Sequence, residues 1–132
     1  MKLIMTAYIS TALIFVSLDA VWLSLMSGRL YKPALQGLLA ENVRLAPALF
    51  FYLLYSGGIV AFAVIPSPTS LQALLRGAGF GLIAYATYDL TNQATLRLWP
   101  AVVTGADLTW GALATGIAAG LSFTICSLVM KG

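Results

Sequence analysis

The sequence predicts an all-α membrane protein: a bundle of four transmembrane helices, with a short interfacial helix between the first and second spans. Hydrophobic residues make up 61% of its 132 residues and charged residues only 8%, whereas a soluble domain carries about 25% charged residues. A soluble fold so poor in charge would have too little polar surface to face water. The apolar residues also gather in four runs, each long enough to cross a hydrocarbon core about 30 Å thick.

The ends of these runs carry residues that commonly bound membrane helices. The first run follows Lys2 and is too long for a cleaved signal peptide, with Asp19 near the place where a cleavage site would lie. Pro47 opens the second run and Pro66 ends it, because proline disrupts a helix interior. Ser70 is the expected N-cap of the third run. The expected spans, within a single domain of residues 1–132, cover residues 3–26, 47–65, 71–96 and 105–130.

The connection over residues 27–46 has the pattern of an amphipathic helix. Leu30, Ala34 and Leu38 recur at helical spacing, and Pro33 suits the first turn of a helix. Charged and amide side chains occupy the other faces. We therefore expect a short helix that lies in the membrane interface.

The basic residues give the chain a net charge of +3. They are scattered singly beside the apolar runs, so they lack the clustered basic face that nucleic-acid binding requires. We expect them to mark helix ends and to contact lipid headgroups. Four spans place both termini on one side of the membrane, with three of the cations on that side and four on the other. This near balance leaves the orientation open.

Three of the four acidic residues lie within or at the edge of apolar spans, where a carboxylate costs roughly 2.5–3.5 kcal/mol at the bilayer centre. Judged by their positions along the spans, Asp19, Asp89 and Asp107 all fall in the half of the membrane that contains the first connection. Asp19 and Asp107 are each followed by a tryptophan three residues later, a spacing that places both side chains on one helix face. We therefore expect the bundle to enclose one polar site.

The predicted binding site combines these acids with the polar face of the third span. Its members are Asp19, Trp22, Tyr85, Asp89, Asn92, Arg97, Asp107 and Trp110. Structural alternatives stay open. Asp107 would form a variant capping box with Thr104. Asp19 would fix the bundle by accepting a hydrogen bond from an indole or by pairing with Arg29 or Arg97. The tryptophans would anchor the protein at the interface. Asp89 has the weakest structural explanation because it lies deepest in a polar stretch.

Histidine is absent, and Cys126 is the only cysteine. These absences argue against catalysis of the Ser-His-Asp or zinc-hydrolase kind and rule out an intramolecular disulfide, and we expect no metal or cofactor. The pairs Gly77-x-x-x-Gly81 and Gly116-x-x-x-Gly120 indicate close helix packing, within the bundle or between copies. No Gly-Lys-Ser/Thr follows these glycines, so they do not form a phosphate loop.

Several strings of the sequence resemble a known family. They include Leu18-Asp-Ala-Val-Trp-Leu23, Tyr85-Ala-Thr-Tyr-Asp-Leu-Thr-Asn92 and Asp107-Leu-Thr-Trp-Gly111. In order and along essentially the whole chain, they are similar to the small bacterial predicted membrane proteins of domain-of-unknown-function family 2177. The resemblance implies a multi-pass protein of the bacterial inner (cytoplasmic) membrane with four spans. It brings no established reaction, cargo or catalytic residue.

The deep carboxylates lead to three hypotheses for function. The first is a small transporter, proton- or cation-linked, that works as a homo-oligomer through a relay of intramembrane acids. The second is an accessory or scaffold subunit of a membrane complex, in which the polar site locks the bundle. The third, an enzyme that modifies membrane lipids with carboxylates as its only acid–base groups, is the least expected of the three. Membrane lipids are the expected partners in each case.

Overall fold

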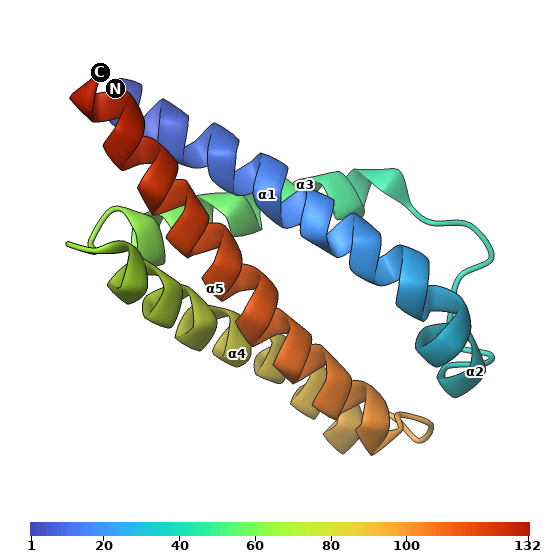
Figure 1. Ribbon diagram of the computed structural model, residues 1–132. Coiled ribbons are helices and arrows are strands. Elements are labelled where there is room, and N and C mark those ends of the chain that lie inside the picture. Colours follow the sequence, from blue (N-terminus) through green and yellow to red (C-terminus); the bar gives the residue numbers. More distant parts are fainter.

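The computed structural model describes all 132 residues, and its regular structure is entirely helical, without a strand (Figure 1). The helices expected from the four apolar runs are all present, with ends that differ from the expected ones by a few residues. Two of them continue into π-helical turns, which are named η1 and η2. The elements in chain order are α1 (Lys2–Met26), η1 (Ser27–Tyr31), α2 (Lys32–Ala34), α3 (Leu45–Ile59), η2 (Val60–Val64), α4 (Ser70–Thr95) and α5 (Ala101–Lys131).

The long helices form two pairs that meet near the chain termini. Helix α3 packs on α1, and α4 packs along α5. Segment η2 contacts α1, α4 and α5, and it therefore lies where the two pairs join. Both termini lie at this end of the molecule, and α1 diverges from α5 with increasing distance from it (Figure 1). The pairs are thus closed at one end and spread apart at the other.

Buried hydroxyl groups join α1 to α5 near the termini. The Oγ atoms of Ser10 and Ser122 are 2.7 Å apart, and the Thr11 hydroxyl donates to Ser122 Oγ over 2.8 Å. Ser122 also donates to the carbonyl oxygen of Ala7 over 3.1 Å. Small hydroxyl side chains allow two helices to approach closely and to form hydrogen bonds where water is absent. This cluster holds the closed end of the molecule together.

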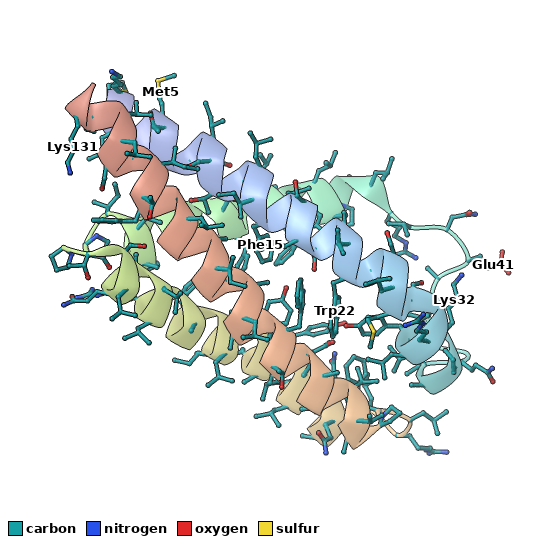
Figure 2. The ribbon with its side chains drawn as sticks, viewed as in Figure 1. Met5, Phe15, Trp22, Lys32, Glu41 and Lys131 are labelled. Carbon is teal, nitrogen blue, oxygen red and sulfur yellow. The ribbon has the colours of Figure 1, made fainter.

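The apolar core lies close to this cluster. It is formed where η2, the middle of α5 and the middle of α1 come together, around the fully buried side chains of Phe15, Ile59 and Ala118. Phe15 points into the space between the helices (Figure 2). Its ring lies 4.9 Å from that of Tyr55, measured between centroids. The apolar core is thus continuous with the aromatic residues at the spread end.

Three helical segments are long and apolar enough to cross a membrane: Lys2–Ala34, Leu45–Val64 and Ala101–Lys131. Helix α4 has 26 residues, but its composition does not place it among these three. Charged side chains lie at the two ends of the molecule, with Lys131 beside the termini and Lys32 and Glu41 at the opposite end (Figure 2). Apolar helices with charges at both ends are what a membrane protein requires.

A separate interfacial helix between residues 27 and 46 is not confirmed. Helix α1 instead continues through η1 and α2 as far as Ala34, and the chain then turns at Gly37, whose φ of +83° is in the left-handed region that favours glycine. Tyr31 and the buried Leu35 hold this segment against the bundle. The apolar residues that predicted an interfacial helix are therefore used partly for packing.

The N-cap predicted for the third long helix was off by one residue. Thr69 is the N-cap of α4, and its hydroxyl accepts a hydrogen bond from the backbone N–H of Gln72 over 3.2 Å. Ser70 instead donates to the carbonyl oxygen of Gly120 over 3.0 Å. The two hydroxyl residues divide the tasks, because Thr69 caps its own helix while Ser70 ties that helix to α5.

Helices α4 and α5 approach so closely that several positions between them have no space for a side chain. A Cβ atom added at Gly81 would lie 2.0 Å from the carbonyl oxygen of Gly111, and one added at Gly77 would lie 2.7 Å from the carbonyl oxygen of Thr115. On the other helix, a Cβ at Gly116 would lie 3.0 Å from the carbonyl oxygen of Leu74. The close packing predicted for the two glycine pairs is confirmed within the bundle.

We expect Gly81→Ala to lower the free energy of unfolding by at least the 1–3 kcal/mol typical of overpacking, because its new methyl group meets backbone that cannot turn aside. Gly79→Ala is the matched control, since nothing lies within 4 Å of a Cβ there. Unfolding of the purified protein in mixed detergent and SDS, followed by circular dichroism, measures both variants. Equal stability of the two would contradict the packing described here.

Candidate functional site

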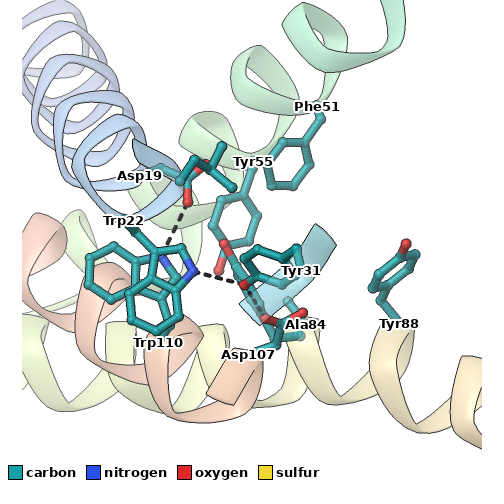
Figure 3. A pocket seen from close by; sticks show the side chains of 11 residues that line it. Asp19, Trp22, Tyr31, Phe51, Tyr55, Ala84, Tyr88, Asp107 and Trp110 are labelled. Atoms are coloured by element: carbon teal, nitrogen blue, oxygen red, sulfur yellow. Dashed lines mark hydrogen bonds between the residues drawn. The ribbon is translucent and has the colours of Figure 1, made fainter. Parts of the chain in front are cut away.

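A cavity of about 390 Å³ lies between the two helix pairs at the spread end of the molecule (Figure 3). All the long helices and η1 contribute to its wall. Two carboxylates, Asp19 and Asp107, face it, and no lysine or arginine does. Most of the remaining wall is aromatic: Trp22, Tyr31, Phe51, Tyr55, Tyr85, Tyr88 and Trp110.

Two tryptophans from different helices stack against each other in this wall. The rings of Trp22 and Trp110 lie 4.6 Å apart between centroids, with an angle of 6° between their planes. The Trp110 indole N–H donates to Oδ1 of Asp19 over 3.1 Å. Helices α1 and α5 run in opposite directions, so the two Asp-x-x-Trp motifs face each other. The Asp-x-x-Trp motif of α1 thus lies opposite that of α5.

Trp22 is linked to Asp107 through the hydroxyl group of a tyrosine. The Trp22 indole N–H donates to the hydroxyl oxygen of Tyr31 over 2.8 Å, and the Tyr31 hydroxyl donates in turn to Oδ1 of Asp107 (Figure 3). Tyr31 reaches Asp107 because η1 continues α1 and brings the ring back over the cavity. The aspartate of each motif is therefore linked to the tryptophan of the other, directly in one case and through Tyr31 in the other.

Asp19 is surrounded by neutral hydrogen-bond donors. Its side chain is 7% exposed, with Tyr52 donating to Oδ2 and Trp110 donating to Oδ1. The structural alternative of an indole that donates to Asp19 is thus present in the structure. Neither donor carries a charge, so the Asp19 carboxyl group has hydrogen-bond partners but no cation beside it.

Asp107 is less completely satisfied. It accepts one hydrogen bond, on Oδ1 from Tyr31, and its side chain is 8% exposed. The capping role expected with Thr104 is wrong, because α5 begins at Ala101 and Asp107 lies in its second turn. Thr104 instead accepts a hydrogen bond from the indole N–H of Trp99 over 3.1 Å. Asp107 therefore accepts fewer hydrogen bonds than Asp19, although it also lines the cavity.

Asp89 is the least satisfied of the three acids. It is fully buried, and neither carboxyl oxygen has a hydrogen-bond partner. It lies close enough to Asp107 for the two carboxyl groups to interact. Buried polar atoms are nearly always hydrogen-bonded, and leaving one unpaired costs about 1–3 kcal/mol or more. The pair Asp89–Asp107 therefore has capacity to bind a proton or a cation.

The predicted site residues separate into two groups. Five of them line the cavity: Asp19, Trp22, Tyr85, Asp107 and Trp110. Asp89 lies next to Asp107 without lining the cavity. Asn92 is half-buried and Arg97 is exposed, and neither belongs to the cavity wall. Arg97 follows the end of α4 at Thr95, so it lies beyond the helix that positions the others.

A family model described as a predicted membrane protein family, DUF2177, matches residues 4–124 of the chain. The chain belongs to this family. No match was found among curated proteins or among solved structures. Membership in DUF2177, together with three apolar helices long enough to span a bilayer, makes this chain a membrane protein. The match includes every residue of the cavity wall.

Three tyrosines of this DUF2177 protein, Tyr31, Tyr52 and Tyr55, take part in the site without having been predicted from the sequence. Tyr31 and Tyr52 supply the hydroxyls that bind the two aspartates, and Tyr55 shares a hydrogen bond of 2.7 Å with Thr115. Tyr52 and Tyr55 stand three residues apart on one helix face, and that spacing was the signal available. Tyr31 gave none, because its pattern fitted the apolar face of an interfacial helix.

We expect Tyr31→Phe to lower the free energy of unfolding by roughly 1–3 kcal/mol, the range for losing the partner of a buried polar group. The variant removes both the donor to Asp107 and the acceptor for Trp22. Tyr88→Phe is the control, because Tyr88 also lines the cavity but is 62% exposed. The same SDS titration compares them, and an equal effect of both substitutions would show that the network adds no stability.

Proposed function

We propose that this protein is a small membrane transporter that binds a cation in the cavity between its two helix pairs. One observation carries the proposal: Asp19 and Asp107 face a common cavity with only neutral tyrosine and tryptophan donors beside them. Acidic residues within a membrane are costly, and they commonly mark pathways for protons or cations. A bound cation would supply the positive charge that the wall lacks.

The number of hydrogen bonds that each acid accepts favours a ligand at Asp107 and Asp89 over a ligand at Asp19. Asp19 accepts two hydrogen bonds, Asp107 accepts one and Asp89 accepts none. A hydrogen bond to a charged group contributes about 1.5–3 kcal/mol, so the bonds to Asp19 are sufficient to offset its insertion cost of roughly 2.5–3.5 kcal/mol. For Asp89 and Asp107, the hydrogen bonds that they accept do not offset this insertion cost. We infer that this pair exchanges a proton for the transported cation.

The proposal includes a fourth membrane span, formed by α4. With 26 residues, α4 is about 39 Å long at 1.5 Å per residue, which exceeds a hydrocarbon core of about 30 Å. It packs along α5, which is itself long and apolar enough to span the membrane. Asp89, its acidic residue, is buried against that neighbour rather than exposed to lipid.

The setting that we propose is a bacterial inner membrane, with the protein working as a homo-oligomer. The family resemblance implies the location. The oligomer follows from size, because four helices are too few to enclose a complete pathway. The stretch over residues 32–44 would then lie near the headgroups, since Lys32, Glu41 and Arg44 are all exposed there.

A second candidate function is that of an accessory subunit, and the same hydrogen bonds favour it. Tyr31–Asp107 and Trp110–Asp19 link the two helix pairs at their spread end. On this view the network only fixes the shape of the molecule, and no ligand is needed. The two functions differ in one measurable respect, because a scaffold moves no charge across a membrane.

We expect Asp107→Asn to abolish cation movement that the unchanged protein supports. Proteoliposomes on a solid-supported membrane are stepped in turn to a higher concentration of H⁺, Na⁺, K⁺ or tetramethylammonium, and the transient current is recorded. At least one cation should give a current that falls about tenfold or more in the variant, as expected when about 1.4 kcal/mol of binding is lost. Glu41→Gln, which neutralises an exposed loop acid, should leave it unchanged.

Two outcomes would go against transport. If the unchanged protein gives no current with any of the four cations, the accessory function becomes the better explanation. If a current is present but survives Asp107→Asn in protein of normal stability, the cation does not pass through this cavity. Thermal unfolding of each variant in detergent provides the check on stability.

The fourth span generates a separate prediction about topology. In a Cys126→Ala background, Gln36→Cys and Arg97→Cys each place one exposed cysteine in a connection. If α4 crosses the membrane, both react with a membrane-impermeant maleimide from the same side, in right-side-out or in inverted vesicles. If α4 does not cross, the two cysteines react from opposite sides, and the four-span arrangement is wrong.

A further inference from the structure

The cavity is open on one side, between α3 and α4. Phe51 of α3 and Tyr88 of α4 stand at this opening (Figure 3), and they are 41% and 62% exposed. Phe51 lies six residues after the start of α3 at Leu45, and Tyr88 lies seven residues before the end of α4 at Thr95. Each is therefore about 10 Å inside its helix end at 1.5 Å per residue.

With α4 as the fourth span, this depth places the opening in the outer part of the hydrocarbon core, close to the headgroups. Helix α4 exceeds the hydrocarbon thickness by about 9 Å, so Tyr88 lies only about one turn below the boundary. A gap between two helices that cross the membrane faces sideways, toward lipid. A ligand that enters here comes from the boundary layer, where amphiphilic cations collect.

The interior of the cavity places a carboxyl group that accepts few hydrogen bonds against aromatic surfaces. Both oxygens of Asp19 already accept hydrogen bonds. Asp107 accepts one hydrogen bond, on Oδ1 from Tyr31, and its carboxyl group lies at the cavity beside that of Asp89. The stacked indoles and the rings of Tyr55 and Tyr85 form the rest of the inner wall, and the faces of such rings attract cations.

The size and ligand set of the cavity favour an organic ion over a metal ion. At about 30 Å³ for each water molecule, its volume of about 390 Å³ holds roughly a dozen non-hydrogen atoms. Nowhere in the structure do three His, Cys, Asp or Glu side chains gather as they would around a metal ion. A bare ion would leave most of the aromatic wall without contact.

We propose that the cavity binds an organic ammonium ion with a compact apolar substituent, which enters between Phe51 and Tyr88. The carboxyl group of Asp107 faces the charge, and the indole and phenol rings enclose the apolar part. This inference rests on the proposed function in two respects, namely that the cavity is a cation site and that α4 crosses the membrane. The ammonium group is equally that of a free amine or of a lipid headgroup, and the chemistry recognised is the same.

The test compares benzyltrimethylammonium with neopentylbenzene, its uncharged isostere, on the unchanged protein. Each is titrated into protein in nanodiscs of phosphatidylglycerol, and tryptophan emission is recorded, because Trp22 and Trp110 line the cavity. We expect a saturable change with the ammonium ion and a dissociation constant at least about tenfold higher for the isostere. Asp107→Asn should raise the dissociation constant for the ammonium ion about tenfold, and Glu41→Gln should not change it.

Equal saturable binding of the two compounds, or no saturable binding of either, would overturn the inference. The comparison of isosteres needs no variant, so a folding defect in Asp107→Asn cannot obscure it. Two further nanodisc preparations, containing phosphatidylethanolamine or phosphatidylcholine, separate the sources. Weaker probe binding in one of them supports a headgroup ammonium as the occupant, and unchanged binding supports a free amine.

Failure of this inference differs from failure of transport. Ammonium binding without any cation current leaves the binding site standing and removes transport. A current of Na⁺ or K⁺ that depends on Asp107, with no discrimination between the isosteres, leaves transport standing and removes the ammonium ligand.

Discussion

The contact between α4 and α5 is the constraint on which the rest of the structure depends. It brings backbone against backbone at Gly81 and Gly111, so the two helices behave as one unit. Because the helices are so close, Asp89 of one lies beside Asp107 of the other, and the Tyr85 ring fills the space over Gly111. The acid pair and the aromatic surface therefore both depend on glycines, which allow α4 and α5 to approach so closely.

The two helix pairs are joined by different chemistry at their two ends. At the closed end small hydroxyl residues such as Ser10 and Ser122 allow close approach and hydrogen-bond across it. At the spread end the gap is wider, and only large side chains such as Trp22 and Tyr31 bridge it. Aromatic rings that span a wide gap leave empty space between them. Small hydroxyl side chains that join two closely packed helices leave no such space. The cavity therefore lies at the end where the bridging residues are aromatic.

Much of this arrangement was predictable from the sequence. Apolar runs gave four helices close to their observed ends, and the Asp-x-x-Trp spacing of Asp19 and Asp107 predicted facing polar surfaces, because i,i+3 positions share a face. The path of η1 was not predictable, since the pattern around Tyr31 fits an interfacial helix equally well. Arg97 was misplaced for a related reason: the sequence locates it near the end of α4 but does not give the direction in which the connection leaves.

The stacked indoles of Trp22 and Trp110 have a consequence for observing the protein. Two stacked aromatic rings 4.6 Å apart share their electronic excitation, and the strength of this coupling in the ultraviolet spectrum depends on the distance between them. One ring belongs to each helix pair, so any change in the spread of the pairs alters the distance between the two chromophores. The ultraviolet spectrum of the unlabelled protein is therefore expected to report how far the two helix pairs are spread.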